Sequence, residues 1–329
     1  MKNLVHAATA AVLTLSISPI AYSADAEELA ADYDCSTVRF GQPSWTGVKV
    51  KTAAATWILE NLDYETETTT ASLAISYKAM EGGDIDTMLS QWFPSARQMF
   101  RPFGIKGSLD MVSPNLTGGT YTVAVPSYVY EAGVTSIEDL DQHRDKFGGE
   151  IYGIDPGSTG NDTVKAMIED DYAGLGDWEL VPSSEPGMLA EVGKRTGDKE
   201  WIAFLAWSPH PMNINYDIKY LSDGAKYWGP NKGEVIVQTV TQEGFAWACT
   251  NVGQFLDNYE WTVEEQSLGM NYVRNEGMEP LAAAKKVIRQ NPDMVSRWLD
   301  RSGIYQTGGI TRMDGSGDSE AIIRDALNL

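Results

Sequence analysis

The sequence is poor in the residues that most enzyme and metal sites require. It contains three histidines and two cysteines among 329 residues, and one histidine, His6, lies in an N-terminal segment that is expected to be removed. A cluster of histidines around a metal and a Ser-His-Asp hydrolase are therefore not expected. The motifs of phosphate-binding loops, nucleophile elbows and zinc proteases are absent as well. No metal or cofactor is predicted.

Positive charge is also in short supply. The chain has 25 Lys and Arg against 46 Asp and Glu, which gives a formal net charge of -21 at pH 7. Phosphate binding requires clustered Lys and Arg, so nucleic acid is excluded as a partner. Hydrophobic residues make up 43% of the chain and charged residues 22%, which is typical of a folded protein and excludes a disordered one.

Residues 1–23 have the pattern of a secretory signal. Lys2 precedes an apolar run from Leu4 to Ile20, and the small residues Ala21 and Ser23 stand where a cleavage site has them. The run is too short and too interrupted for a transmembrane helix, and no later stretch is apolar enough to span a bilayer. We therefore expect an exported, periplasmic protein without membrane insertion.

The two cysteines that the chain contains, Cys35 and Cys249, lie far apart in the sequence. In an oxidising compartment such a pair most often forms one structural disulfide, which is our prediction. Two buried free thiols are the alternative. A redox function is not indicated, because the C-x-x-C spacing is absent.

After the signal, strand-like and helix-like segments alternate along the chain. They indicate a βαβαβ opening, a second α/β set and a group of C-terminal helices. A capping box, Thr262 with Glu265, starts one helix, and Pro280 lies in the first turn of another. The pattern favours two α/β lobes that share crossover strands. The predicted strands are Thr37–Phe40, Tyr64–Thr70, Ile85–Leu89, Tyr121–Pro126, Glu150–Ile154, Trp201–Trp207 and Val235–Thr241, and further helices are Val48–Asn61, Leu73–Glu81 and those that begin near Ser136, Asn161 and Pro186.

Aromatic residues, in contrast, are plentiful, with ten Trp, fifteen Tyr and eight Phe, several of them next to Pro or Gly. Trp45 and Trp92 follow predicted strands of the first set, and Tyr128 and Trp207 stand at the ends of strands of the second set. Open α/β sheets bind ligands beyond the carboxyl ends of their strands, so these four rings are expected to face one cleft. A core position is the usual alternative for one aromatic residue, but four at strand ends favour a binding site.

Six short strings carry a family resemblance. Ser-Trp-Thr-Gly-Val, Gly-Gly-Asp-Ile-Asp, Gln-Trp-Phe-Pro, Val-Pro-Ser-Tyr-Val, Gly-Ser-Thr-Gly-Asn and Trp-Ser-Pro-His-Pro-Met occur in this order. Together they resemble the substrate-binding proteins of glycine betaine, choline and carnitine ABC importers, over essentially the whole chain after the signal. The resemblance implies a type II periplasmic binding protein, with two α/β domains joined by a hinge around a ligand cleft. We expect lobe 1 in residues 24–115, lobe 2 in residues 116–215 and a return to lobe 1 in residues 216–329.

The resemblance also implies a monomeric receptor that delivers a small methylated amine to ABC permease subunits and catalyses no reaction. The trimethylammonium group would lie in an aromatic box of Trp45, Trp92, Tyr128 and Trp207, with Asn161 near the polar end. Physical chemistry supports such a box independently. A quaternary ammonium has no N–H to donate, and its methyl-covered charge is attracted to aromatic faces by about 2 kcal/mol per desolvated contact.

The polar end of the ligand separates the candidates. Choline receptors that resemble this chain carry Asp two residues after the first Trp, where this chain has Gly47, which argues against choline. A carboxylate at Glu131 would repel the carboxylate of glycine betaine or carnitine, but it could accept a hydrogen bond from a protonated N-oxide. The chain therefore resembles most closely the trimethylamine N-oxide receptors of the family. A solvent-facing or helix-start role is the alternative for Glu131, and choline or glycine betaine is the alternative ligand.

Two other hypotheses have less support. A secreted enzyme with carboxylates in the cleft would need a pair of acids, which the candidate loops lack. Asp314, Ser316 and Asp318 place oxygens as in a Ca²⁺ loop, but the glycine and the final acidic residue of such a loop are missing. A solvated turn is predicted there.

Overall fold

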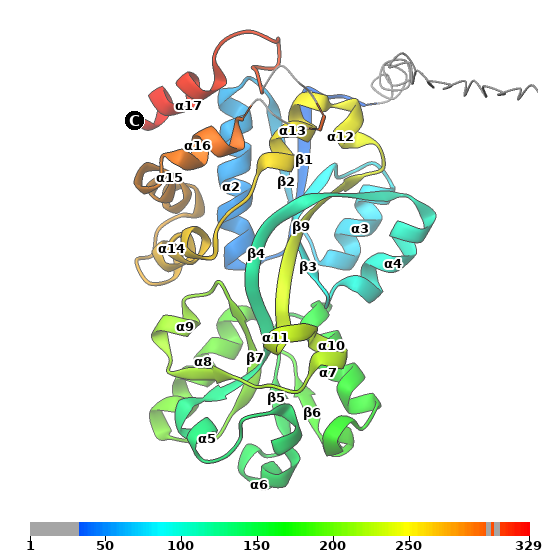
Figure 1. Cartoon of the computed structure of the whole chain (residues 1–329), viewed down its shortest axis with the longest axis vertical. Coiled ribbons are helices and arrows are strands. Elements are labelled where there is room, and N and C mark those ends of the chain that lie inside the picture. Colours follow the sequence, from blue (N-terminus) through cyan, green and yellow to red (C-terminus); the bar gives the residue numbers. More distant parts are fainter. Residues whose placement is uncertain (1–32, 301–303, 306–309) are drawn as a thin grey trace, which may run out of the picture.

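The computed structural model describes residues 33–300, 304–305 and 310–329. The predicted signal, residues 1–23, lies outside the described residues. Within the described part, no helix is both long enough and apolar enough to cross a bilayer. The strands form one mixed sheet in the order β2-β1-β3-β9-β4-β7-β5-β6, with β8 paired to β4. Two lobes lie one above the other along this sheet (Figure 1).

Lobe 1 contains both ends of the described chain. Its strand β1 is parallel to β2 and β3, and β9 joins β3 antiparallel. The C-terminal helices lie beside α2, whereas α3 and α4 lie across the strands from them (Figure 1). The elements are β1 (Thr37–Gln42), α2 (Thr46–Asn61), β2 (Glu65–Thr70), α3 (Leu73–Glu81), β3 (Thr87–Phe93), α4 (Arg97–Lys106), α12 (Phe245–Ala248), α13 (Thr250–Asn258), α14 (Val263–Arg274), α15 (Pro280–Gln290), α16 (Asp293–Trp298) and α17 (Ser319–Leu327).

Lobe 2 is formed by one continuous stretch of chain. Its strand β7 is antiparallel to β4 and parallel to β5, which is in turn parallel to β6. The elements are α5 (Ser127–Glu131), α6 (Arg144–Phe147), β5 (Glu150–Tyr152), α7 (Thr159–Glu169), β6 (Glu179–Val181), α8 (Glu185–Asp198), β7 (Ala203–Ser208), α9 (Met212–Asn215), β8 (Ile218–Tyr220), α10 (Ala225–Trp228) and α11 (Pro230–Gly233), with short 3-10 turns at Ile137–Asp139, Asp141–His143 and Tyr172–Asp177.

Two long antiparallel strands, β4 (Leu109–Pro126) and β9 (Glu234–Gln242), run from one lobe into the other (Figure 1). Their pairing is irregular, because the register shifts three times between Met111 and Gly119. Pro114, which has no N–H to donate to the ladder, lies in this irregular stretch. The connection between the lobes is therefore a strand pair with gaps in its hydrogen bonding.

The return to lobe 1 comes later than the predicted boundary at residue 216. Leu221 and Trp228 belong to the buried cluster of lobe 2, and β8 pairs with the last residues of β4. The chain re-enters lobe 1 only along β9. The short elements between residues 216 and 233 carry no clear periodicity, so the sequence pattern did not separate them from lobe 1.

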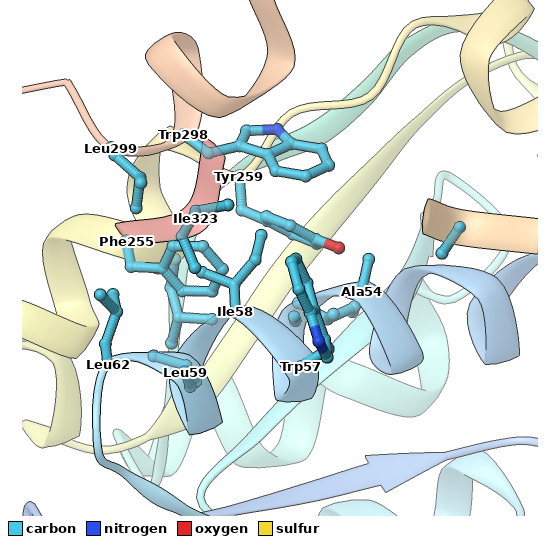
Figure 2. Packing of buried hydrophobic residues seen from close by; sticks show 14 of the residues in the cluster. Ala54, Trp57, Ile58, Leu59, Leu62, Phe255, Tyr259, Trp298, Leu299 and Ile323 are labelled. Carbon is cyan, nitrogen blue, oxygen red and sulfur yellow. The ribbon is translucent and has the colours of Figure 1, made fainter. Parts of the chain in front are cut away.

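The core of lobe 1 is centred on α2. Figure 2 shows Ile58 of this helix between Ile323 and Tyr259, with Trp298 next to Tyr259, all three from the C-terminal half of the chain. The ring centroids of Tyr259 and Trp298 are 4.6 Å apart. Burial of a large apolar side chain contributes about 1.5–3 kcal/mol to the free energy of folding, so this cluster holds the C-terminal segment against α2.

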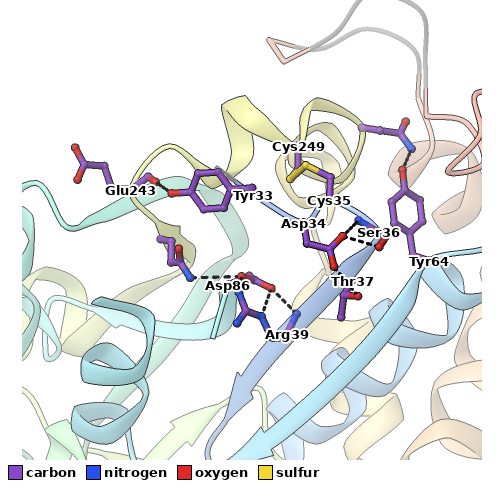
Figure 3. Close-up of a disulfide and its surroundings, with 12 residues drawn as sticks. Tyr33, Asp34, Cys35, Ser36, Thr37, Arg39, Tyr64, Asp86, Glu243 and Cys249 are labelled. Atoms are coloured by element: carbon purple, nitrogen blue, oxygen red, sulfur yellow. Dashed lines mark hydrogen bonds and ion pairs between the residues drawn. A yellow bond between two sulfur atoms is a disulfide. The ribbon is translucent and has the colours of Figure 1, made fainter. Parts of the chain in front are cut away.

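The predicted disulfide is confirmed. Cys35 and Cys249 are bonded, with their Cα atoms 5.3 Å apart and 214 positions apart in sequence. The bond lies next to the start of β1, near the ion pair of Arg39 with Asp86 (Figure 3). It ties the first strand of lobe 1 to the junction of α12 and α13.

The local signals for helix ends are also confirmed. The hydroxyl of Thr262 accepts a hydrogen bond from the N–H of Glu265, whose carboxylate accepts one from the N–H of Thr262. Pro280 lies in the first turn of α15. Ser136 caps a 3-10 turn instead of a longer helix. No helix is predicted at α4, because Pro102 in its interior obscures the helical pattern.

Candidate functional site

A pocket lies where the two lobes meet, and four aromatic side chains line it. Trp45 and Trp92 come from lobe 1, and Tyr121 and Trp207 come from lobe 2. The ring centroid of Tyr121 is 5.9 Å from that of Trp92 and 5.9 Å from that of Trp207, with interplanar angles of 70° and 78°. The rings therefore meet at steep angles, as the walls of a box do.

The ends of secondary-structure elements place three of these rings. Trp45 is the N-cap residue of α2, and Trp92 and Trp207 are the next-to-last residues of β3 and β7. Tyr121 lies inside β4, where the antiparallel register sets it opposite Trp207. A Cβ at Gly160 would collide with the Tyr121 hydroxyl, so the glycine at the start of α7 makes room for the ring. Burial raises the pKa of Tyr121 above its usual value, which keeps the hydroxyl protonated.

Asp155 of lobe 2 holds the first of these rings across the lobe boundary. Its carboxylate accepts hydrogen bonds from Nε1 of Trp45 at 3.1 Å and from the hydroxyl of Ser44 at 3.3 Å. This contact fixes the indole at the mouth of the pocket.

Asn161 does not line the pocket. Its side chain is buried under the loop after β5, where Oδ1 accepts from the N–H of Ile154 at 2.9 Å and Nδ2 donates to the Ile154 carbonyl at 2.8 Å. The residue that the sequence placed near the polar end of the ligand thus supports the loop that carries Ile154 and Asp155.

Tyr128 and Glu131 do not line the pocket either. Both are in α5, where the Tyr128 hydroxyl donates to the carbonyl of Glu200 and Glu131 is exposed. The prediction assumed that the strand before Tyr128 runs parallel to its neighbours. Because β4 is antiparallel to β7, the end of β4 points away from the end of β7 that carries Trp207. Tyr121, earlier in the same strand, takes the position expected for Tyr128.

A buried carboxylate joins the two lobes beside the aromatic rings. Glu185, the first residue of α8, accepts hydrogen bonds from the N–H of Thr46 at 3.1 Å and from its hydroxyl at 2.6 Å. Arg274 of α14 donates to the same carboxylate at 3.2 Å. Burial by itself raises the pKa of Glu185, but the donors around the carboxylate bring that pKa below its usual value. Glu185 is therefore ionised at neutral pH.

His210 completes this carboxylate site. Its Nδ1 accepts from the N–H of Met212 at 2.9 Å, so Nε2 carries the proton and donates to Glu185 at 3.2 Å. Its ring centroid lies 4.9 Å from that of Trp207. Burial lowers the pKa of His210, which leaves the ring neutral at pH 7. The histidine orients the carboxylate and supports Trp207.

In lobe 1, the wall of the pocket combines apolar side chains with three polar ones. Lys51, Ser90 and Gln266 line it and are all buried. The ammonium group of Lys51 donates to Oδ1 of Asn115 at 2.5 Å. Burial lowers the pKa of Lys51 to about 7, an effect that the Glu260 carboxylate offsets only in part.

Neither a metal site nor a Ca²⁺ loop is formed by the part of the chain that the structure describes. No group of three or more His, Cys, Asp or Glu side chains there could hold a metal ion. Asp314 accepts from the N–H and the hydroxyl of Ser316, and Asp318 caps α17. These oxygens are used in a turn and a helix cap.

Residues 36–290 match the family described as the substrate-binding domain of ABC-type glycine betaine transport systems. The chain belongs to this family. Its members are transport binding proteins, so the chain is a substrate-binding protein and not an enzyme. The glycine betaine/carnitine transport binding protein GbuC of Listeria monocytogenes is 30% identical over 199 residues, which cover 60% of this chain and 62% of that protein.

Two solved structures of similar proteins confirm the fold class predicted for this chain, an α/β periplasmic binding protein. An ABC-transporter choline-binding protein in complex with choline is 36% identical, with a TM-score of 0.84 over 89% of this chain and 98% of that chain. Lactococcal OpuAC, in its closed conformation with glycine betaine, is 28% identical, with a TM-score of 0.72 over 80% of this chain and 98% of that chain.

Proposed function

We propose that this chain captures a small trimethylated amine in the aromatic box and delivers it to the permease of an ABC importer. The observation that carries the proposal is the convergence of Trp45, Trp92, Tyr121 and Trp207 from two lobes on one pocket. Four such faces supply about 8 kcal/mol of gross attraction at about 2 kcal/mol each, which corresponds to about micromolar affinity before ordering costs. The relatives that bind choline and glycine betaine support the same ligand class.

Trimethylamine N-oxide is the favoured ligand within this class. The cavity is small, about 40 Å³, which suits a compact molecule. Gly47 offers no carboxylate to accept a hydrogen bond from the choline hydroxyl. Glu131 lies outside the pocket and no longer bears on the choice. Glycine betaine and choline remain the alternative ligands.

Capture is proposed to take place in the periplasm, after removal of residues 1–23. The mass of the exported protein tests this directly. A mature chain that begins at Ala24 is expected, and retention of the full N-terminus would contradict the export signal.

A calorimetric titration tests the ligand class. The purified protein is titrated with trimethylamine N-oxide, glycine betaine, choline and carnitine, and Trp92→Ala is titrated alongside. The variant is expected to lose about tenfold or more in affinity, since one cation–π face is removed. Trp201→Ala is the matched control, because Trp201 packs on Phe147 in lobe 2 and is not among the pocket-lining residues. Absence of binding by every methylated amine would defeat the proposal.

A further inference from the structure

The connection between the lobes contains a buried polar cluster at the point where its strand pairing is irregular. In β4, Pro114 and Leu116 lie opposite consecutive residues of β9, so Asn115 between them is the extra residue of a β-bulge. The register of β3 with β9 also shifts in this region, and Thr239 of β9 falls within the shifts on both sides. The backbone is thus irregular on both sides of Thr239.

The side chain of Asn115 joins three strands at this irregularity. Its Nδ2 donates to the hydroxyl of Thr239 in β9 at 3.0 Å and to the carbonyl of Leu89 in β3 at 3.2 Å. Its own backbone carbonyl accepts from the N–H of Trp261 at 3.0 Å. Asn115 and Thr239 are both fully buried. A single amide therefore connects β4 to β9 and to β3 where the register shifts.

The ammonium group of Lys51 holds this amide from α2. It donates to Oδ1 of Asn115 at 2.5 Å and to the backbone carbonyl of the same residue at 3.4 Å. The Lys51 carbonyl accepts from the hydroxyl of Tyr259 at 2.7 Å, so this turn of α2 is held in turn by the C-terminal half of the chain. Both acceptors of the ammonium are neutral oxygens, and burial of a charge in such surroundings is costly. Buried polar networks that are fully bonded specify one arrangement of the elements that they join.

The cluster lies between the pocket and the segment that leads into lobe 2. Lys51 and Leu89 line the pocket, so the cluster is directly behind the pocket wall. Along β4, Leu116–Gly119 separate Asn115 from Thr120, the first residue that pairs with β7 of lobe 2. Strand β4 is therefore fixed to lobe 1 as far as Asn115 and enters lobe 2 shortly after it.

We propose that Lys51 and Asn115 are positioning residues that fix the point where lobe 1 ends and the movement of lobe 2 begins. With their bond in place, lobe 2 has a narrow range of orientations around the one in which the four aromatic rings line one pocket. Without it, the movable segment extends further back into β4, and more of the orientations separate the rings. The fraction of molecules that is ready to bind then falls, and the apparent affinity falls by the same factor for every ligand.

Distances between spin labels on the two lobes of the ligand-free protein test the proposal. The labels are placed at Ala282→Cys in α15 and Glu169→Cys in α7, which are both exposed, while the native cysteines are bonded to each other. Thr239→Val removes the hydroxyl that accepts from Asn115 and keeps the shape of the side chain. This variant is expected to broaden the distance distribution, and Lys51→Met is expected to broaden it more.

Two substitutions serve as matched controls. Thr241→Val changes a buried threonine two residues further along β9, whose hydroxyl has no hydrogen-bond partner in the part of the chain that the structure describes. Lys49→Met changes a half-buried lysine of α2 and leaves the bond between Lys51 and Asn115 intact. Both controls are expected to leave the distance distribution as it is in the unmodified protein.

Calorimetric titration gives a second measure, which rests on the proposed function, whereas the distances do not. Lys51→Met is expected to weaken the binding of trimethylamine N-oxide, glycine betaine and tetramethylammonium by one common factor of about fivefold, because the loss lies in the fraction of molecules ready to bind. The order of the three affinities should not change.

Two results would overturn the proposal. One is an unchanged distance distribution in the folded Thr239→Val and Lys51→Met proteins. The other is a loss of affinity confined to the ligands that carry an oxygen, which would make Lys51 a ligand contact. Circular dichroism verifies folding, and Thr239→Val alone decides the matter if Lys51→Met does not fold. If no onium binds to the unmodified protein, the proposed function fails, but broadened distances would still support the role of Lys51 and Asn115.

Discussion

The two lobes are built in different ways and bring different chemistry to the pocket. Lobe 1 is assembled from both ends of the described chain and is cross-linked by Cys35–Cys249, whereas lobe 2 is one continuous stretch. Lobe 1 provides two indoles and the buried polar side chains of Lys51, Ser90 and Gln266. Lobe 2 provides Tyr121, Trp207 and the Glu185 carboxylate. Neither lobe has a complete box, so ligand affinity must depend on bringing the two together.

The largest predicted effect is on stability and concerns lobe 1, which contains the disulfide. Replacement of both Cys35 and Cys249 by Ser is expected to lower the free energy of unfolding by about 3–5 kcal/mol, because the disulfide closes a long loop in the unfolded chain. Denaturant unfolding measures this loss. The affinity of the folded protein is expected to stay within about threefold, since the bond is remote from the pocket. A large loss of affinity would show that cross-linking of lobe 1 shapes the site.

The second prediction compares one ring from each lobe. Trp92→Ala in lobe 1 and Trp207→Ala in lobe 2 should each cost about 2 kcal/mol, or about thirtyfold in affinity, if both faces contact the onium. Titration calorimetry with the same ligand measures both. An unaffected Trp207→Ala variant would mean that lobe 1 holds the ligand alone and that lobe 2 only covers it.

The third prediction concerns the contact between the lobes. Glu185→Gln keeps the side-chain shape but weakens the bonds to Thr46 and Arg274, so we expect a loss of about 1–2 kcal/mol in ligand affinity through a less favourable closed arrangement. Glu191→Gln is the matched control, because this acid is on the same helix and pairs with Arg195 near the surface. Equal effects of the two substitutions on affinity would show that Glu185 does not contribute to lobe closure.

The fourth prediction is a pH dependence that arises in lobe 1. Burial lowers the pKa of Lys51 to about 7, so its charge is lost as the pH rises through that value. The unfolded chain keeps this proton up to about pH 10, so the free energy of unfolding should rise between about pH 7 and about pH 9. Denaturant unfolding at several pH values measures the change. Lys51→Met should abolish this rise, and a rise of equal size in that variant would contradict the assignment to Lys51.

Local sequence signals predicted most of lobe 1 and part of the site. The alternation of β-branched and helical segments, the capping boxes and the position of Trp45, Trp92 and Trp207 at element ends can all be recognised within a few residues. Trp92 and Trp207 converge because β3 and β7 run in opposite directions from the two lobes, so that both strands end at the boundary between the lobes.

The remaining site residues depend on pairings that no local pattern reveals. Tyr121 is found only once β4 is known to be antiparallel to β7, because its own surroundings look like an ordinary buried strand. Glu185 and Gln266 reach the pocket from helices far along the chain, and the contact of Glu185 with Thr46 spans 139 residues. Such contacts arise from packing between lobes, which sequence periodicity does not describe.

The irregular pairing of β4 with β9 has a mechanical consequence. A strand pair with a complete hydrogen-bond ladder resists bending. The ladder of β4 and β9 is interrupted between Met111 and Gly119, so this pair is less stiff where it passes from one lobe to the other. Because both strands are continuous, the two lobes stay linked at a fixed separation. We therefore expect the two lobes to turn about this ribbon, while the continuous strands keep the aromatic rings of the two lobes in register with each other.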